Sequence, residues 1–435
     1  MAVHDAFVGQ GCFGSVEPAP AVSVGAGGIW GHVYNEVATK RGRYVQGGGC
    51  TTVGVPGLIL GGGFGSFSKA FGLAAAGLME AEIVTADGEI RIANPCTNPD
   101  LFWALKGGGG GFGVVTRVTL RTHELPDTMG IMLATIRPMS DSAYRRLIGK
   151  IIDFYSEELF NPHWGEQIIF APDNLSIMMT FQGLGRMEAD ALWRPFFEWV
   201  AEEPQEFVVA SPLRSVAAPG RHFWDPSALK AVPGLVVVDD RDGAPEVNIF
   251  YTGNLGEAGE VLHAYQSLWL PPAALLKDDQ RERLSDALFA AAKHWGVSLH
   301  VNKGLAGAPP EVIASARDTA MNPAVVDAFA LAISGAHGPP AYPGIAGHEP
   351  DAATARDHAA AIESAMNELR QIAPRAGAYV WESNFFQPNW QEAYWGKNYV
   401  RLLAVKKKYD PNGLFYLHHG AGGEGWSEDG FTKMP

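Results

Sequence analysis

The residues best suited to chemistry lie in one glycine-rich segment, Gly47–Gly65, which carries a cysteine, Cys50, near its start. Glycines at this density let the backbone approach a flat or anionic ligand, because no Cβ intervenes, and they expose N–H groups as donors. A nicotinamide-binding GxGxxG pattern would follow an N-terminal strand, open a helix and precede an acidic residue by about 20 positions. Here the glycines flank a Val/Leu/Ile turn in mid-domain, so a nicotinamide Rossmann domain fits poorly. Tight turns in a β-rich domain remain the alternative interpretation.

A second segment repeats this design. Asn98–Lys106 predicts a short helix, and it is followed by five glycines, Phe112 and Gly113, and then by an apolar strand. Each glycine costs about 0.5–1 kcal/mol relative to alanine in regular structure. The density of glycines therefore indicates that bare backbone lies beside a ligand here as well.

The elements around these two segments predict an α+β domain over residues 20–126. We expect a strand at 20–25, a helix at 29–40, a hairpin at 80–91 that turns at Asp87-Gly88, and a strand at 114–121. Strand pairing is expected to be mostly local. The regular βαβα rhythm of a doubly wound sheet is missing.

From about residue 127 the pattern changes to long amphipathic helices and a further hairpin. Ser140-Asp141 is expected to cap a helix, and residues 166–182 form a hairpin around Asp173-Asn174. Further helices are expected at 189–202, 279–295 and 354–372, with loops at the Pro-rich stretches 271–272, 309–310 and 339–350. This middle region predicts an antiparallel sheet with one face covered by helices. A last helix is expected over 390–408, ended by a turn at 409–413.

Length and composition fit a soluble two-domain protein. The chain has 435 residues, 47% of them hydrophobic, and a formal net charge of −14, which argues against a nucleic-acid surface. The basic run Lys406–Lys408 is interpreted as a solvated helix face. No apolar stretch reaches the ~20 residues that span a bilayer, and Met1–Asp5 does not resemble a secretory signal. The compartment, cytoplasmic or secreted, stays open.

The chain has three cysteines, Cys12, Cys50 and Cys96, none in CxxC spacing, so a structural zinc site is not expected. An odd number suggests one pair and one thiol with a separate task. Cys12 and Cys96 are candidates for the pair, which the sequence alone does not establish.

The two glycine segments, together with a C-terminal stretch that runs from Tyr394-Trp395-Gly396-Lys397-Asn398 to Tyr409-Asp410-Pro411-Asn412, resemble a known family. The likeness is to the vanillyl-alcohol oxidase/p-cresol methylhydroxylase (PCMH) superfamily, berberine bridge enzyme-like branch, from about Val3 to Trp426. It implies a two-domain PCMH-type fold: an FAD-binding domain at 1–126, a substrate-binding domain at 127–385, and a C-terminal element at 386–435 that returns to the FAD domain.

The resemblance also implies a cofactor site. In the family pattern GxCxxVGxxGxxxGGG the cysteine can form a thioether to the flavin ring, and Cys50 occupies that place. Val55 falls where the family controls oxygen access to the flavin, although Pro56 replaces a usual glycine and Leu58 a frequent histidine. The cofactor-binding residues implied in this way are Gly49, Cys50, Thr51, Val53, Gly54, Val55, Gly57, Gly61, Gly62, Gly63, Gly65, Gly113, Val115 and Asn412.

For catalysis, the resemblance points to Tyr379. It aligns with a YxN motif whose tyrosine helps to deprotonate the substrate hydroxyl, but Trp381 stands in place of the asparagine. A tyrosine with an ordinary pKa of about 10 needs cationic or hydrogen-bonding help to act as a base near neutral pH. Glu382 is a second candidate acid or base. An ordinary strand tyrosine and a surface carboxylate are the respective alternatives.

One family feature has no counterpart. Family members carry an upstream GGH or TGH loop that cradles the pyrophosphate and can supply a histidyl flavin bond, and neither His4 nor His32 matches it. We expect a truncated gene product, an internal start, or a variant that binds FAD without the histidyl bond.

The functional expectation is an FAD-dependent oxidase that takes hydride from a C–H beside a hydroxyl or amine of a small metabolite or sugar, with oxygen as acceptor. A dehydrogenase with another acceptor and a flavin-deficient, inactive homologue are the alternatives. The substrate pocket is expected on the middle sheet, with Trp381, Phe385 and Phe386 as aromatic candidates. His418-His419 lacks a third spaced ligand, so it is interpreted as structure near the flavin and no metal is expected.

Overall fold

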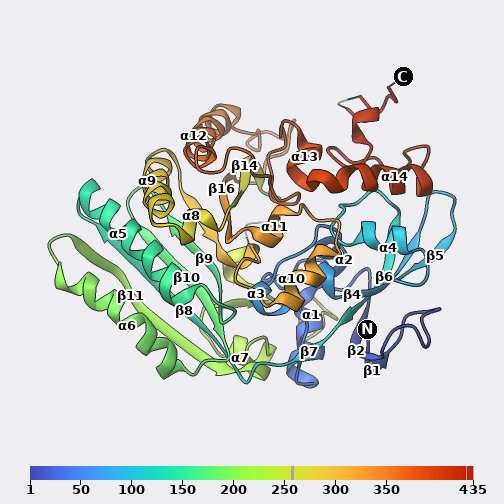
Figure 1. The fold of residues 1–435 in the computed structure, drawn as a ribbon, viewed down its shortest axis with the longest axis horizontal. Helices are drawn as coiled ribbons and strands as arrows, with labels where there is room; N and C mark the ends of the chain where they lie inside the picture. The colour runs from blue at the N-terminus through green and yellow to red at the C-terminus, as the bar shows by residue number, and fades with distance from the viewer. Residues whose placement is uncertain (256–258, 428, 435) are drawn as a thin grey trace.

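The computed structural model describes residues 1–255, 259–427 and 429–434 (Figure 1). Two antiparallel sheets dominate it, one of five strands and one of seven, and helices pack on both. The predicted α+β class is therefore confirmed. Within the described residues, no helix combines the length and the apolar character needed to cross a membrane.

The five-stranded sheet belongs to the N-terminal part, with strand order β1-β2-β6-β4-β5. Its hairpin of β4 and β5 and its strand β6 lie where the sequence predicts them. Pairing is less local than expected, because β6 inserts between β2 and β4 and joins segments far apart in the chain. Its strands are β1 (Ala2–Phe7), β2 (Ala19–Gly25), β4 (Leu78–Val84), β5 (Ile90–Ala93) and β6 (Val114–Arg121), and a separate two-stranded sheet pairs β3 (Arg43–Tyr44) with β7 (His123–Glu124).

Short helices join these strands and bury apolar side chains beneath the glycine segments. The predicted helix at 29–40 forms as α1 followed by one π-helical stretch. The helices are α1 (Trp30–Tyr34), η1 (Asn35–Lys40), α2 (Val55–Leu60), α3 (Ser68–Phe71), η2 (Ala74–Gly77) and α4 (Pro99–Leu105).

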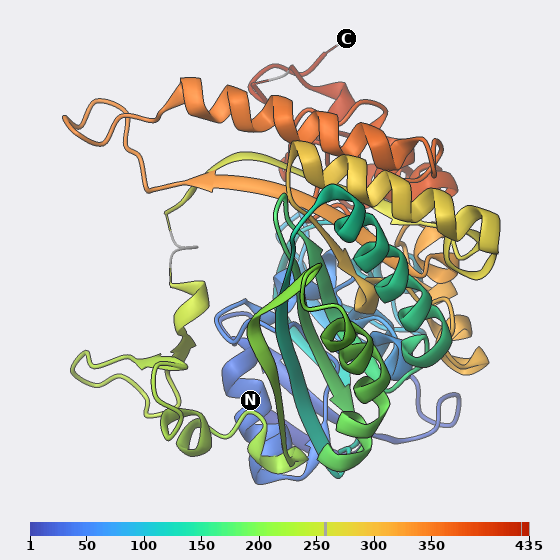
Figure 2. The same cartoon turned by 90° about the vertical axis from the view of Figure 1, so that its left-hand side faces the viewer.

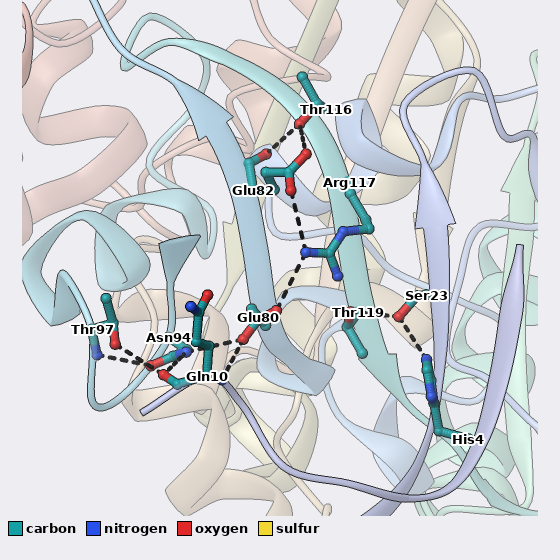
Figure 3. Close-up of polar contacts among 10 residues, drawn as sticks. All are labelled: His4, Gln10, Ser23, Glu80, Glu82, Asn94, Thr97, Thr116, Arg117 and Thr119. Carbon is teal, nitrogen blue, oxygen red and sulfur yellow. Dashed lines mark hydrogen bonds and ion pairs between the residues drawn. The ribbon is translucent and has the colours of Figure 1, made fainter. Parts of the chain in front are cut away.

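A polar network, drawn in Figure 3, holds the loop after β1 against this sheet, and a disulfide does so as well. The buried carboxylate of Glu80 accepts hydrogen bonds from the Gln10 N–H at 2.7 Å and from Asn94 Nδ2 at 3.1 Å. Cys12 and Cys96 form a disulfide, which confirms the candidate pair. Cys50 lies outside it.

Because this disulfide joins residues 84 positions apart, its loss enlarges the unfolded ensemble. We expect the double variant Cys12→Ala/Cys96→Ala to lose about 2–4 kcal/mol of unfolding free energy, measured by urea denaturation. Dithiothreitol should lower the wild-type midpoint and leave the double variant unchanged, with Cys50→Ala as the single-cysteine control. A wild-type midpoint insensitive to the reductant contradicts this.

The seven-stranded sheet forms the middle part, with order β11-β8-β10-β9-β15-β16-β14 and antiparallel pairing throughout the described ladders. Its strands are β8 (Thr128–Pro138), β9 (Trp164–Phe170), β10 (Leu175–Gln182), β11 (Phe207–Pro219), β14 (Val261–Leu270), β15 (Val297–His300) and β16 (Ala330–Gly338). Long helices cover one face of it (Figure 2), as predicted. A continuous apolar core fills the space between.

The helices start where the sequence signals lie. The hydroxyl of Ser140 accepts from the Ala143 N–H and caps α5. The Pro-rich stretch 271–272 forms the expected loop just before α8, whereas Pro310 of the stretch 309–310 is the first residue of α10, because proline suits a first helical turn. The helices are α5 (Asp141–Phe154), η3 (Tyr155–Leu159), α6 (Arg186–Glu202), α8 (Ala273–Leu276), α9 (Asp278–His294), η6 (Val301–Lys303), α10 (Pro310–Arg317), α11 (Ala324–Asp327) and α12 (Ala352–Arg370).

Between β11 and β14 the chain leaves the sheet and runs outward beside the N-terminal part (Figure 2). The ring of Trp224 in this excursion stacks on Tyr34, with centroids 4.3 Å apart. Its elements are η4 (Gly220–His222), α7 (Pro226–Lys230), β12 (Val236–Val238), β13 (Ile249–Tyr251) and η5 (Thr252–Asn254).

The C-terminal element returns to the N-terminal part, as expected (Figure 1). The single helix predicted over 390–408 is wrong in one respect: it is broken into α13 (Trp390–Trp395), η7 (Gly396–Asn398) and α14 (Tyr399–Tyr409), and η8 (Gly423–Gly425) follows. The break lies at Gly396, whose φ of +50° is accessible to glycine and interrupts a helix. It lets the buried Trp395 donate its indole N–H to the Gly107 carbonyl at 3.1 Å.

The interpretation of Lys406–Lys408 as a solvated face is wrong for Lys406, whereas Lys407 and Lys408 are exposed. Lys406 is 6% exposed, and its ammonium donates to Asp410 Oδ2 and the Gly111 carbonyl, each at 2.6 Å. Lys408 pairs with Asp100 of α4 at 2.6 Å. Lys406 therefore fastens the C-terminal element to the second glycine segment, and Lys408 fastens it to α4.

A buried lysine connects the two sheets. Lys69 of α3 is 1% exposed, and its ammonium donates to three backbone carbonyls of the middle part, including those of Gly304 at 2.6 Å and Phe329 at 3.1 Å. Nearby, Gly165 of β9 touches the carbonyl oxygen of Ser66, and any Cβ there would overlap that oxygen. These two contacts set the distance between the parts.

Lys69→Met keeps the length of the side chain but leaves three buried carbonyls without their cationic donor. We expect it to lower the free energy of unfolding by about 3 kcal/mol, measured in urea. The matched control is Lys40→Met, which removes an exposed i,i+4 pair with Glu36 and should cost less than about 0.5 kcal/mol. Equal losses in the two variants contradict a structural role for Lys69.

Candidate functional site

A cavity of about 560 Å³ opens between the uncovered face of the seven-stranded sheet, the first glycine segment and the outward excursion. Cys50, the predicted flavin anchor, lies in its wall. The lining also includes Gly49, Ser66, Met129, Ile131, Leu133, Glu166, Gln167, Met178, Thr180, Val216, Ala218, His222, Phe223, Trp224, Ala228, Leu229, Val232, Leu235, Tyr251 and Asn254.

Polar groups gather at the end of the cavity that holds Cys50. The side-chain amide of Asn254 donates to Cys50 Sγ at 3.5 Å. The hydroxyl of Ser66 donates a short hydrogen bond to the carboxylate of Glu166, and that carboxylate lies 3.8 Å from the position a Cβ would take at Gly49. A thiol and a carboxyl group therefore share one end of the same cavity.

Glu166 reaches the cavity through an unusual backbone conformation. Trp164, Ile168 and Phe170 of β9 all point into the core, and strict alternation would send Glu166 the same way. Its φ of +67° turns the side chain to the cavity instead. A non-glycine residue in this region costs roughly 1–3 kcal/mol, and such strain concentrates at functional sites.

Burial disfavours the ionised form of this carboxyl group. Burial raises the pKa of Glu166 above its usual range, against the lowering effect of the Ser66 hydrogen bond and of Lys303. Lys303 is engaged with Glu382, whose carboxylate it contacts at 2.6 Å. The charge of Lys303, beside the Ser66–Glu166 pair, is therefore already balanced by the carboxylate of Glu382.

The glycines of the first segment divide into two groups. An added Cβ would meet nothing within 4 Å at Gly54 or Gly57, and these residues, like Gly49 and Val53, are exposed. At Gly61 a Cβ would overlap the ring of Trp381, and at Gly62 the sulfur of Met321. Gly54 and Gly57 therefore leave bare backbone open to a ligand. Gly61 and Gly62 instead make room for side chains that pack against the segment.

The remaining predicted cofactor residues lie mainly in the packing. Gly63 and Gly65 contact neighbouring protein atoms, and Thr51 is buried with its hydroxyl on the Ile249 carbonyl at 3.3 Å. Val55, predicted to control oxygen access, and Val115 belong to the N-terminal core. Gly113 packs on the backbone of β4, and Asn412 is exposed in the turn after α14.

The two predicted catalytic residues are absent from the cavity lining described above. Tyr379 is 4% exposed and meets Phe64 edge to face, with ring centroids 5.1 Å apart. Burial, and secondarily the charge of Glu382, raises the pKa of Tyr379 well above its ordinary value. The tyrosine therefore keeps its proton near neutral pH. No cationic group lowers its pKa against the effect of burial.

Trp381, which stands where the family has asparagine, covers part of the glycine segment. Its indole N–H donates to the Gly57 carbonyl at 2.9 Å while 44% of the residue stays exposed. Phe385 stacks on His418, with centroids 4.1 Å apart, and His418 stacks on His419. The His418-His419 pair thus has a structural place in an aromatic stack.

The donor chemistry and the open backbone fit a flavin at Cys50. The thiol is partly exposed in a cavity wall, and the adjoining exposed backbone of Gly49, Gly54 and Gly57 leaves room where a Cβ would stand. Residues of the seven-stranded sheet, the first glycine segment and the outward excursion face this space. The site residue that sequence reasoning missed is Glu166; the one available signal was a carboxylate at an inward position of the apolar strand WGEQIIF.

Comparison with known proteins places these features in a family. Residues 14–94 match the family described as FAD binding domain, and residues 378–421 match the family Berberine and berberine like. The FAD-linked oxidoreductase easE of Arthroderma benhamiae is 32% identical over 94% of this chain and 76% of its own length. The VAO-type flavoprotein oxidase VAO615 of Thermothelomyces thermophilus is 29% identical over 95% of this chain and 66% of its own.

Solved structures agree. The VAO-type flavoprotein MtVAO615 from Myceliophthora thermophila C1 superimposes with a TM-score of 0.74 at 25% identity, covering 98% of this chain and 70% of that protein. A carbohydrate oxidase from Microdochium nivale shares the fold, with a TM-score of 0.67 at 22% identity over 92% of this chain and 78% of that protein.

The chain spans 64–66% of the length of the first curated relatives it matches. The two family matches coincide with the Cys50 segment and with the C-terminal element that packs against the N-terminal core. Because a relative 32% identical is covered over three quarters of its length, the chain belongs to the berberine bridge enzyme-like branch of the vanillyl-alcohol oxidase/p-cresol methylhydroxylase superfamily of FAD-linked oxidoreductases.

Proposed function

We propose that this chain binds FAD at Cys50 and oxidises a C–H group beside a hydroxyl or amine of a small molecule, with oxygen as the electron acceptor. The observation that carries the proposal is the position of the Cys50 thiol, at the polar end of a cavity whose opposite wall is the middle sheet. Cys50 of the N-terminal part would hold the cofactor, and the wall formed by the middle sheet would hold the substrate beside it.

Cys50, with the exposed backbone of Gly49, Val53, Gly54 and Gly57, would hold the flavin. FAD supplies a two-electron acceptor for hydride. The protein's own contribution is to bind and orient the substrate: the apolar side chains of β8, β10 and β11 exclude water, and Glu166 offers the carboxyl group next to Cys50.

The sequence assigns Tyr379 and Glu382 to acid–base catalysis; because neither lines the cavity, we propose here that they support the site from outside its lining. Tyr379 holds its proton and packs against Phe64 of the glycine segment. Glu382 neutralises Lys303, which also acts on Glu166. Both residues would position their neighbours, whereas Glu166 faces the substrate.

Oxygen as acceptor is supported by the relatives that are named oxidases, including the VAO-type flavoprotein oxidase VAO615. A dehydrogenase with another acceptor differs only in the step that reoxidises the flavin. The domain boundaries proposed from the sequence, 126/127 and 385/386, fall in the connections between β7 and β8 and between the middle part and α13.

The test is to incubate the purified chain with FAD, remove excess cofactor by gel filtration and record the visible flavin absorbance. We expect flavin to co-elute with the protein and to remain in the acid-precipitated pellet, because a thioether survives denaturation. Cys50→Ala should lose all of the pellet-bound flavin. To separate an oxidase from a dehydrogenase, the rate at which air reoxidises the reduced flavin is compared with the rate at which a dye acceptor reoxidises it under nitrogen.

The matched control is Thr52→Ala, an exposed neighbour on the same loop, which should retain the flavin. Protein that elutes without flavin after incubation with FAD would overturn both the oxidase and the dehydrogenase and would support the flavin-deficient alternative. Flavin that co-elutes but is lost on acid treatment would overturn the thioether alone.

A further inference from the structure

The outward excursion, which projects from the middle sheet in Figure 2, contacts the cofactor loop at its far end. The Thr51 hydroxyl donates to the Ile249 carbonyl of β13 at 3.3 Å, and the Asn254 amide donates to Cys50 Sγ at 3.5 Å. Tyr251 lines the same cavity as Cys50. A molecule that approaches Cys50 from this side therefore has to pass residues of the excursion.

The excursion is anchored by packing at its start. Trp224 is 7% exposed, belongs to the N-terminal core and stacks on Tyr34. The strands that follow, β12 and β13, pair with each other and with no other described strand, and a two-stranded sheet alone is marginally stable in water. Four apolar side chains beyond Trp224 remain 36–49% exposed: Val232, Leu235, Val237 and Val238. A segment that leaves so much apolar surface exposed opens locally at a low free-energy cost.

A polar contact holds the far part of the excursion to the N-terminal part. Nε2 of His32, on α1, lies 2.6 Å from Oδ1 of Asn248. The Nδ2 of Asn248 donates to the carboxylate of Asp239 at 3.1 Å, so its Oδ1 is the acceptor and His32 Nε2 carries the hydrogen. Arg241 donates two hydrogen bonds of 2.7 Å to the same carboxylate and fixes its position. The asparagine is therefore oriented toward His32 in advance.

We propose that residues 225–254 form a lid that opens about the Trp224 anchor to admit bulky molecules to Cys50, and that the His32–Asn248 hydrogen bond is the latch that keeps the lid closed. The inference rests on the proposed function for the identity of the entering molecule, a flavin, and it deepens that function by naming what controls access to the thiol. Neither latch residue lines the cavity, so both are positioning residues. The strength of the latch sets the fraction of molecules in which the lid is open.

The experiment measures how fast Cys50 reacts with two maleimides of different size in the full chain without flavin. Cys12 and Cys96 are held in their disulfide, so Cys50 is the thiol that reacts, and Cys50→Ala should stay unlabelled. N-ethylmaleimide is small, whereas N-pyrenylmaleimide carries a flat, fused ring system, as a flavin does. Each rate is divided by the rate of the same reagent with N-acetylcysteine. We expect the wild-type chain to react faster with the small reagent on this scale.

Asn248→Ala is the decisive variant, because it removes the acceptor of the latch and leaves the cavity lining unchanged. The pyrenyl reagent should react about fivefold faster than with the wild type, as for the loss of one hydrogen bond, and the ethyl reagent should change by less than about twofold. His32→Ala should act in the same way, and His32→Gln, which keeps a donor, should recover part of the latch. The matched control is His4→Ala, which removes a histidine hydrogen bond of 2.9 Å to Ser23 between β1 and β2 and should change neither rate.

Hydrogen–deuterium exchange of the wild-type chain gives a second measurement that needs no variant. Backbone amides of residues 232–254 should exchange faster than those of β8, because β8 is paired on both sides within the seven-stranded sheet.

Equal acceleration of both reagents in Asn248→Ala, or no acceleration of the pyrenyl reagent, overturns the latch. Lid amides that exchange as slowly as those of β8 overturn the lid itself. Because neither measurement uses flavin, these results stand whether or not the chain binds FAD. A chain that binds FAD but shows neither signal refutes this inference and leaves the proposed function intact, whereas a chain that shows both signals but elutes without flavin overturns the proposed function and leaves the lid.

Discussion

The close approach of Gly165 to the carbonyl oxygen of Ser66 is the contact on which the candidate site depends. No side chain other than hydrogen fits between β9 and the segment that follows the first glycine run, so the middle and N-terminal parts meet at a fixed distance. That distance puts the Ser66 hydroxyl on Glu166 and the Gly49 backbone beside the same carboxylate. The ammonium of Lys69 holds the adjoining edge by donating to three carbonyls of the middle part. Neither part alone contains the site, and the cavity exists because the middle part and the first glycine segment are joined here.

The same contact explains how a strained residue persists. A glutamate at φ +67° is unfavourable by roughly 1–3 kcal/mol, which is a noticeable fraction of the stability of a typical domain. The flanking residues Trp164 and Ile168 are anchored in the core, and β10 pairs along the whole of β9, so the backbone is over-determined on both sides. The surrounding packing imposes the conformation, and the carboxyl group is delivered to the cavity as a consequence.

Much of the fold follows from local sequence signals. The Ser140 cap, the turn at Asp87-Gly88 and the alternation at 114–121 each depend on a few neighbouring residues, so each could be predicted. The burial of Lys406 could not be predicted in this way. Its burial depends on carbonyls of Gly111 and Phe415 and on Asp410, which the chain brings together only after α14 has packed against the second glycine segment. The break at Gly396 likewise reflects the place of Trp395 against the Gly107 carbonyl, a tertiary demand that helical periodicity does not record.

The site was predictable in part for a related reason. Cys50 could be found because it occupies the cysteine position of the family pattern GxCxxVGxxGxxxGGG. Glu166 could not, because its importance lies in a backbone angle that reverses the alternation of an otherwise ordinary strand. Glycine density identified the right segment but overstated its contact with a ligand. Gly61 and Gly62 are small because Trp381 and Met321 occupy their Cβ space, whereas Gly54 and Gly57 face open space. In this fold glycine therefore serves two demands within twenty residues, close packing between the two parts and bare backbone at the cofactor loop. Only the three-dimensional neighbours of each glycine show which demand it meets.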